Sequence, residues 1–224
     1  MTIMKTMFGW VLSTVAPHMR KPNGGLGGWI AMRLMDQANP PSTIEGIRRM
    51  NLGVTDTFVE LGAGHGVGLK AVLTNQEVVP KKIVCVEISA DFRTKLEGIV
   101  QKETRQKLVD RVSIHSDDCR DMSFLADGSV DKMFAMNVIY FLDPIDAYLK
   151  EIYRVISPNG FIVFGCKFPT LPKDSDVFIN IEESAIVEAM RAAGFEVTSK
   201  YIQLAKEGEN KMVNYTELRG TKSA

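Results

Sequence analysis

Short apolar runs alternate with longer amphipathic stretches through most of the chain. Between the apolar runs, residues 91–107 and 144–156 place apolar side chains at helical spacing. Strands that alternate with helices are typical of βαβ units, so the pattern predicts a parallel sheet with helices on both faces. The expected parallel strands are 57–61, 83–87, 112–115, 132–137 and 161–166.

The last third of the chain departs from this alternation. A helix is predicted over 180–193, closed by Gly194 in the position after the helix end. Two further apolar segments, 195–204 and 211–218, flank Gly208 closely enough to pair as a hairpin. The predicted fold class is therefore α/β, with a Rossmann-like, doubly wound, mostly parallel sheet of seven strands, the last hairpin strand being antiparallel.

The first part of the chain does not fit the alternation. Residues 1–15 form an amphipathic helical pattern, and a glycine-rich stretch at 24–28 suggests a hinge. We expect a helical lead-in or lid at 1–41 and one catalytic domain at 42–224. Three roles stay open for the lead-in: closing over a substrate, packing on the core, or peripheral membrane contact through residues 1–15.

A capping box at 42–45 predicts the start of the first helix of the domain. Its pattern indicates that Ile44, Ile47 and Met50 are buried, and Gly53 is expected to end it.

The composition says little about the fold, but it excludes several classes of partner and site. Lysine plus arginine and aspartate plus glutamate number 27 each, so no net charge attracts nucleic acid, and none is expected as a partner. The three cysteines form no C-x-x-C and the three histidines no i,i+4 pair, which predicts reduced thiols and no metal site. Residues 1–15 are too short to span a bilayer and lack a signal-peptide pattern. We expect an intracellular, cytoplasmic protein that is membrane-associated only if 1–15 lie on a surface.

The densest candidate chemistry follows the first strand. From Thr57 the chain reads T-F-V-E-L-G-A-G-H-G-V-G, and a helix is predicted to begin near Val67. Glycine tolerates positive φ and lets a ligand approach the backbone, while a helix N-terminus offers free N–H groups. The loop therefore predicts a site for an adenosine-bearing cofactor. A dinucleotide fingerprint, G-x-G-x-x-G, fits neither register, because the spacing is E-x-G-x-G-x-G.

This spacing resembles the first motif of class I S-adenosylmethionine-dependent methyltransferases. Four further motifs follow in the order of that family. Glu87 ends the second strand; 116–124 resembles G-D-A-x-x-L-P-F; 127–134 resembles D-x-S-F-D; and 149–163 resembles L-x-E-x-x-R-V-L-x-P-G-G. The resemblance spans 57–166 and looks nearest to the small-molecule branch that includes quinone-biosynthesis methyltransferases.

The resemblance implies S-adenosyl-L-methionine as the cofactor and assigns residues to it. Glu87 would accept the ribose hydroxyls, with Ile88 beside the adenine. The residues that would wrap the methionine part are those of the first motif, Glu60, Gly62, Ala63, Gly64 and Gly66.

The later motifs would complete the site. Asp118 would accept the adenine amino group, but the adjacent Asp117, which replaces the family's glycine, leaves open which acid faces the base. Cys119 stands in the same motif where the family has alanine. Asn137 and Tyr140 would face the reaction centre; the alternative is that Tyr140 and Phe141 are core aromatics.

The predicted function is methyl transfer from S-adenosylmethionine to a small or lipid-like acceptor. The work of the protein would be to align acceptor, methyl and sulfur, with a base needed only for an acceptor proton of high pKa. Tyr140 and His18 are candidates for that base. Two rivals remain: a non-catalytic S-adenosylmethionine-binding protein and a nicotinamide-dependent oxidoreductase, against which the glycine spacing counts.

Overall fold

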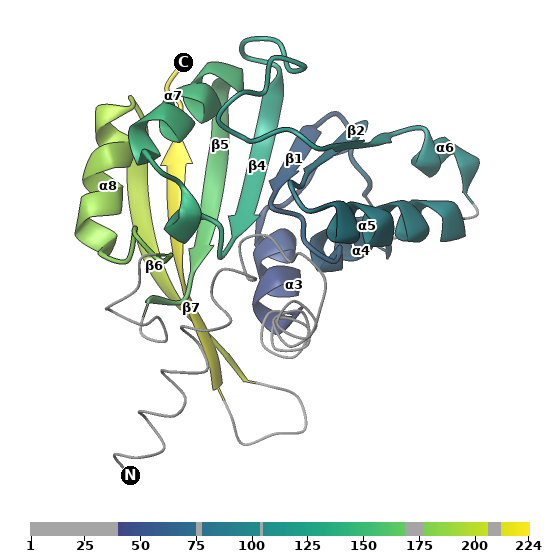
Figure 1. The fold of residues 1–224 in the computed structure, drawn as a ribbon, viewed down its shortest axis with the longest axis horizontal. Coiled ribbons are helices and arrows are strands. Elements are labelled where there is room, and N and C mark those ends of the chain that lie inside the picture. The colour runs from purple at the N-terminus through teal and green to yellow at the C-terminus, as the bar shows by residue number, and fades with distance from the viewer. Residues whose placement is uncertain (1–39, 75–77, 104, 169–176, 206–211) are drawn as a thin grey trace.

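The computed structural model describes residues 40–74, 78–103, 105–168, 177–205 and 212–224 (Figure 1). The predicted lid and lead-in at 1–41 therefore lies outside the described residues, apart from Pro40 and Pro41. His18 and Gly208 lie outside them as well.

Seven strands form one sheet in the order β3-β2-β1-β4-β5-β7-β6 (Figure 1). All pairs among the first five strands are parallel, and β7 pairs antiparallel with both β5 and β6. The predicted fold class is confirmed. The strands are β1 (Thr57–Leu61), β2 (Lys82–Val86), β3 (Val112–His115), β4 (Val130–Met136), β5 (Ile156–Cys166), β6 (Glu196–Ala205) and β7 (Met212–Thr221).

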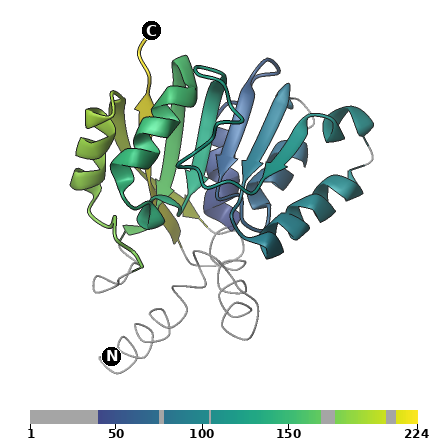
Figure 2. The same ribbon diagram turned by 45° about the horizontal axis from the view of Figure 1, so that its top comes forward.

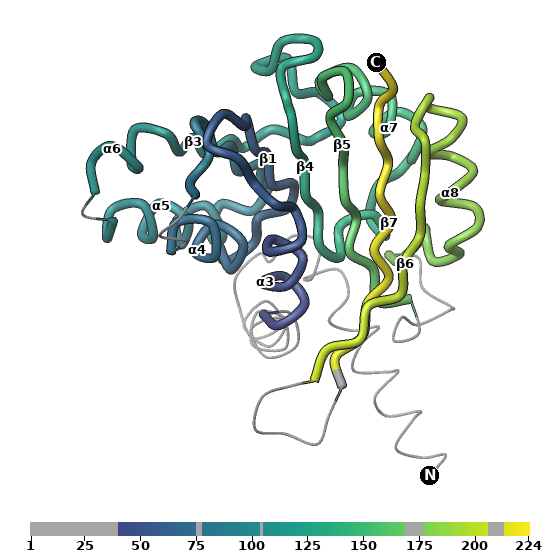
Figure 3. The backbone as a smooth tube through the Cα atoms, turned by 180° about the vertical axis from the view of Figure 1, so that it is seen from behind, coloured from purple at the N-terminus to yellow at the C-terminus, as the bar shows by residue number. Residues whose placement is uncertain are grey.

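Helices cover both faces of this sheet. Figure 2 shows α7 and α8 on the β4–β7 half of the molecule and α5 at the β1–β3 half, and α3 comes to the front when the chain is seen from behind in Figure 3. The helices are α3 (Pro40–Arg49), α4 (Val67–Thr74), α5 (Ala90–Lys102), α6 (Gln106–Val109), the 3-10 turn η1 (Ile139–Phe141), α7 (Ile145–Val155) and α8 (Glu183–Ala192).

Burial on both faces explains why the central strands are apolar throughout. All five residues of β1 are buried, and successive side chains enter opposite layers. Phe58 packs in the layer formed with α3, α4 and α5, whereas Val59 packs in the layer formed with α7 and α8. The core therefore lies on both sides of the sheet, and the strand ends are left for the site.

The buried side of the first helix differs from the predicted one. It starts at Pro40, and Ile44 is 51% exposed, so the prediction that Ile44 is buried is wrong. The packed side carries small residues instead, and a Cβ added to Gly46 would lie 2.6 Å from the Phe134 ring. The helix ends at Arg49, before Gly53, and Asn51 takes the left-handed conformation at φ 47°.

Two further boundaries are corrected. The helix expected over 91–107 stops at Lys102, because Glu103 is extended and the Arg105 side chain turns to the Leu73 carbonyl at 2.6 Å. The turn expected at 157–160 lies inside β5, which already pairs with Val130 through Ile156. Asn159 supplies a positive φ of 64° at this irregularity. The predicted helix end at Gly194 is confirmed, with φ 107°.

The cysteines Cys85, Cys119 and Cys166 are all free and buried. Among the described residues, no group of three or more histidine, cysteine or acidic side chains could hold a metal ion. No helix in the described ranges is long and apolar enough to cross a membrane.

Candidate functional site

The candidate site lies where the direction of strand addition reverses. From β1 the chain adds β2 and β3 on one side, then returns to add β4 on the other side of β1. In open α/β sheets, ligands bind outside the carboxyl ends of the strands at such a switch point. The glycine loop after β1 and the loop after β4 both start there.

Three of the four loop glycines are required by the protein itself. A Cβ added to Gly62, at φ +59°, would lie 2.6 Å from Val138 Cγ2, in the segment after β4. A Cβ added to Gly66, at φ +84°, would overlap Ile99 of α5. At Gly68, inside α4, an added Cβ would overlap the Glu60 carboxyl group.

Gly64 differs from its neighbours. It has φ +54°, and among the residues that the structure describes an added Cβ would meet nothing closer than the Gly62 carbonyl oxygen at 3.8 Å. The space beside Gly64 is therefore open to a bound molecule, and the glycine backbone is free of a side chain there.

Glu60 places a carboxyl group beneath this loop. It is only 4% exposed, and its Oε2 atom has no hydrogen-bond partner among the described residues. Burial, reinforced by the nearby charge of Glu87, raises the pKa of Glu60 to about 8, although a hydrogen bond from the Leu69 backbone acts in the opposite direction. The Oε2 atom of Glu60 is therefore left available for a hydrogen bond with a ligand.

Glu87 joins the second strand to the glycine loop. Its Oε2 accepts a hydrogen bond from the Gly64 N–H at 2.9 Å, and its Oε1 accepts one from the Ser89 N–H at 2.8 Å. Burial raises the pKa of Glu87, while those two hydrogen bonds oppose the rise. The structure therefore brings Glu87 and Gly64 together, with the half-buried Ile88 next to Glu87 in the chain.

The loop after β3 separates the two adjacent acids. Asp118 accepts hydrogen bonds from the Tyr148 hydroxyl at 3.1 Å and from the Arg120 N–H at 3.0 Å. Asp117 instead lies 3.9 Å from His115 Nδ1. Cys119 is buried in the core layer formed with α7 and α8. Asp118 is thus the acid tied into a defined network of hydrogen bonds.

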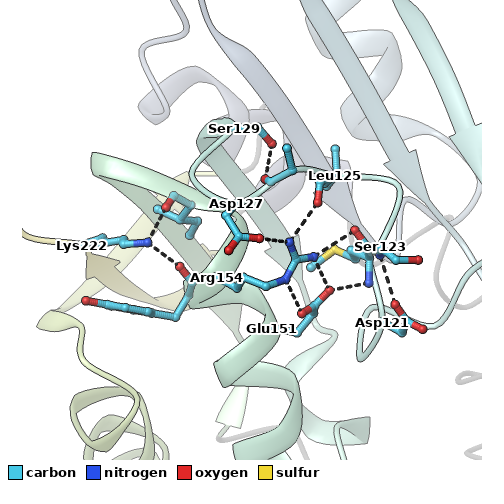
Figure 4. Close-up of polar contacts among 12 residues, drawn as sticks. Asp121, Ser123, Leu125, Asp127, Ser129, Glu151, Arg154 and Lys222 are labelled. Atoms are coloured by element: carbon cyan, nitrogen blue, oxygen red, sulfur yellow. Dashed lines mark hydrogen bonds and ion pairs between the residues drawn. The ribbon is translucent and has the colours of Figure 1, made fainter.

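Helix α7 fastens this loop to the body of the protein (Figure 4). Glu151 accepts a hydrogen bond from the Met122 N–H at 2.6 Å. Arg154 donates to the Leu125 carbonyl at 3.0 Å and to the Met122 carbonyl at 3.2 Å, and it pairs with Glu151 and Asp127. This role of Glu151 and Arg154 was not predicted from the sequence, where the E-x-x-R spacing was the available signal.

The segment after β4 carries the predicted reaction-centre residues. Asn137 takes a left-handed φ of 57°, and its side-chain oxygen accepts a hydrogen bond from Tyr140 at 3.3 Å. The Tyr140 hydroxyl also accepts the Lys167 backbone N–H, and burial raises the pKa of Tyr140 well above its usual range. A tyrosine held in this way keeps its proton at neutral pH, which favours a positioning role for Tyr140 over that of a base.

Lys167 was not singled out from the sequence. It follows β5 at the same end of the sheet, and burial lowers the pKa of its ammonium group to about 8. The Lys167 side chain therefore changes between its charged and neutral forms close to neutral pH.

The features of this site fit an adenosine-bearing cofactor with a charged amino-acid part. The open space lies beside Gly64, and the unpartnered Glu60 oxygen lies below the same loop. Glu87 and Asp118 follow the next two strands, where a ribose and a purine amino group need acceptors.

Known proteins give a consistent identification. Residues 59–164 match the family described as "Methyltransferase domain". Over 86 residues the chain is 33% identical to sterol 4-C-methyltransferase strm-1 of Caenorhabditis elegans, a match covering 34% of this chain and 25% of that relative.

Solved structures share the fold across most of the chain. One chain of the complex between the Haloferax volcanii Trm112 methyltransferase activator and a methyltransferase gives a TM-score of 0.69 at 19% identity, covering 88% of this chain and 95% of that one. Haemonchus contortus phosphoethanolamine N-methyltransferase 2, solved with S-adenosyl-L-methionine, gives 0.61 at 15% identity, covering 82% and 53%. Residues 59–164 thus match a methyltransferase domain, and the chain shares the fold of solved methyltransferases. The match and the fold support S-adenosylmethionine as the cofactor.

Proposed function

We propose that this protein transfers the methyl group of S-adenosylmethionine to a small, apolar or lipid-like acceptor. The observation that carries the proposal is the open space beside Gly64, whose added Cβ, unlike those of Gly62, Gly66 and Gly68, would meet no side chain of the described residues. Buried acids adjoin it in Glu60 and Glu87. When bound, the cofactor supplies a methyl group already activated on a sulfonium.

The residues of the site divide the binding between them. The backbone at Gly64, with Glu60 below it, holds the amino-acid part of the cofactor. Glu87 holds the ribose, and Asp118 accepts the adenine amino group. Charge-assisted hydrogen bonds of this kind contribute about 1.5–3 kcal/mol each. Gly62, Ala63, Gly66, Ile88, Asp117, Cys119 and Asn137 complete the proposed cofactor site.

An aromatic group at the ends of β4 and β5 supports an apolar acceptor. The Tyr140 ring lies 6.1 Å from Phe141, 6.0 Å from Phe168 and 6.0 Å from Phe178, measured between centroids. Phe141 and Phe178 are themselves 5.2 Å apart. Tyr140 and Phe178 are buried, so only the half-buried Phe141 and Phe168 offer apolar ring surface for an acceptor. The similarity to a sterol methyltransferase also supports an apolar acceptor.

A non-catalytic S-adenosylmethionine-binding role would use the same cofactor site. It is favoured by one observation, which is that the hydroxyl of Tyr140 is buried and engaged with Asn137 and Lys167. Incubating the protein with methyl-labelled cofactor and a cell lipid extract separates the two functions. Label in a lipid product supports the enzyme, and a labelled cofactor that stays intact throughout supports the binding protein.

The cofactor site is tested by substituting Gly64. Gly64→Val fills the open space, so we expect it to abolish S-adenosylhomocysteine binding in calorimetry while the circular dichroism spectrum stays native. Gly98→Val, in α5, is the control for adding a valine in open space, because an added Cβ at Gly98 meets nothing within 4 Å among the described residues; it does not reproduce the positive φ of Gly64. Unchanged affinity in Gly64→Val would refute the placement.

A further inference from the structure

The hydroxyl of Tyr148 reaches out of the core to a solvent-exposed acid. Tyr148 is 2% exposed and packs among the core residues between the sheet, α7 and α8. Asp118 is exposed, and its Oδ2 accepts the Tyr148 hydroxyl at 3.1 Å. Because the ring is fixed by close packing, the position of this hydroxyl is fixed as well.

A second contact fixes the other oxygen of the same carboxylate. Asp118 Oδ1 accepts the Arg120 N–H at 3.0 Å, and the Asp118 carbonyl accepts the Asp121 N–H at 2.9 Å. Each carboxylate oxygen has room for a further hydrogen bond, so these contacts orient Asp118 without exhausting it as an acceptor. Asp117 has no such framework and lies beside His115.

The backbone that carries Asp118 is held in place from the same helix. Tyr148, Glu151 and Arg154 follow one another at intervals of three residues, which places them on one side of α7. Glu151 and Arg154 bind the backbone at Met122 and Leu125, as described above. The two ends of the loop also meet, since the His115 and Phe124 rings stack at 3.8 Å.

We infer that Tyr148 is a positioning residue that aims Asp118 at the amino group of the bound adenine, on a loop that Glu151 and Arg154 clamp to α7. The inference rests on the proposed function, because it requires the adenine to lie at Asp118. It also decides between the adjacent acids, assigning the base contact to Asp118 and leaving Asp117 as a surface residue. Helix α7 therefore sets the selectivity of the protein for the purine of its cofactor.

The test compares two ligands in calorimetry: S-adenosylhomocysteine and its analogue with hydrogen in place of the 6-amino group. The wild type should prefer the amino-bearing ligand. Tyr148→Phe should reduce that preference by about 3- to 10-fold, a partial loss, because Asp118 keeps its own contact with the adenine and loses only one of the hydrogen bonds that orient it. Tyr153→Phe is the matched control on the same helix, because its ring packs against Phe195, away from Asp118. It should leave the preference unchanged.

A double-mutant cycle makes the assignment specific. If Tyr148 acts through Asp118, then Tyr148→Phe has no further effect on the preference once Asp118→Ala is present. Equal preference in the wild type and Tyr148→Phe, or full additivity of the two substitutions, would overturn the inference while leaving the proposed function intact. If the wild type bound neither ligand, the proposed function itself would fall, and the inference with it.

Discussion

Glu60 occupies a place where a negative charge is costly. It lies fully inside the protein, beside a second acid, and below a loop built to approach a ligand. Its raised pKa means that the folded, cofactor-free protein holds a proton there at neutral pH. A cationic amino group bound above it would reverse this preference, so binding of the cofactor and release of a proton are linked at this residue.

The same shift predicts how stability depends on pH. The pKa of Glu60 is about 8 in the folded protein and about 4.5 when the chain is unfolded. Between these values the folded state retains a proton that the unfolded state has released. The contribution of Glu60 to stability is therefore fully present below the lower value and is lost as pH rises toward the higher one, by at most about 1.4 kcal/mol per pH unit.

Glu60→Gln, which cannot ionise, should flatten this slope. Urea unfolding of both proteins without cofactor, at a series of pH values across the window, measures it. Curves that run parallel for the wild type and Glu60→Gln would show that the proton is held elsewhere.

The sequence predicted the residues of the glycine loop but not their separate tasks. All four glycines looked like parts of a ligand cradle, whereas Gly62, Gly66 and Gly68 face Val138, Ile99 and Glu60. Those neighbours belong to other elements of the fold, so the sequence around the loop does not predict them. The same holds for Tyr148, whose core position was predicted from helical spacing while its hydroxyl contact depends on the path of a loop 30 residues earlier.

At the scale of elements, α7 is held at its middle and at its carboxyl end. Its middle clamps the loop after β3, and its carboxyl end is capped from the last part of the chain. Lys222 Nζ donates to the carbonyls of Tyr153 and Ile156, each at 2.9 Å, and the ammonium also lies 4.5 Å from the Tyr153 ring centroid. The last carbonyl groups of a helix have no hydrogen-bond partner within the helix and carry a partial negative charge. A cation that binds them there stabilises the helix.

Lys222→Met keeps the aliphatic stem and removes the donor. We expect it to lower the free energy of unfolding by about 1–3 kcal/mol, the cost of leaving such acceptors unsatisfied. Lys150→Met, on the exposed side of the same helix, should change stability by less than about 0.5 kcal/mol. Chemical denaturation of the three proteins compares them. Equal losses in both variants would mean that the cap contributes nothing of its own.

Element prediction succeeded where the signal was local. The bounds of β1 and β3 agree with the sequence pattern, as does the end of α8 at Gly194. The predicted bounds were wrong where contacts with residues distant in the sequence determine the end of an element. Helix α5 ends because Arg105 binds the Leu73 carbonyl, and β5 begins early because Ile156 finds Val130.

At the scale of the whole molecule, the strand ends gather the site while the first 39 residues lie outside the described structure. The composition of residues 1–35 predicts a lid that selects the acceptor. Its contact with a membrane surface and the cytoplasmic location of the protein also remain predictions. The fold class could be predicted because few arrangements are compatible with strands that alternate with helices.

Removing residues 1–35 tests the lid. The truncated protein should bind S-adenosylhomocysteine within about a few-fold of the full chain, because the cofactor residues all lie later, yet it should lose methyl transfer to any acceptor found for the full chain. Calorimetry and labelled-methyl assays measure the two effects. Normal turnover would refute the lid, and loss of folding would show that the segment belongs to the core.

The position of β7 between β5 and β6 has a consequence for how the chain is made. A ribosome delivers β6 before β7, yet β7 is the neighbour through which β6 joins the sheet. Until β7 emerges, β6 has no place to dock, and β5 presents an open edge of unpaired backbone groups. The nascent protein therefore passes through a stage that invites pairing with other chains, and a chaperone that shields β5 during synthesis would raise the yield of folded enzyme.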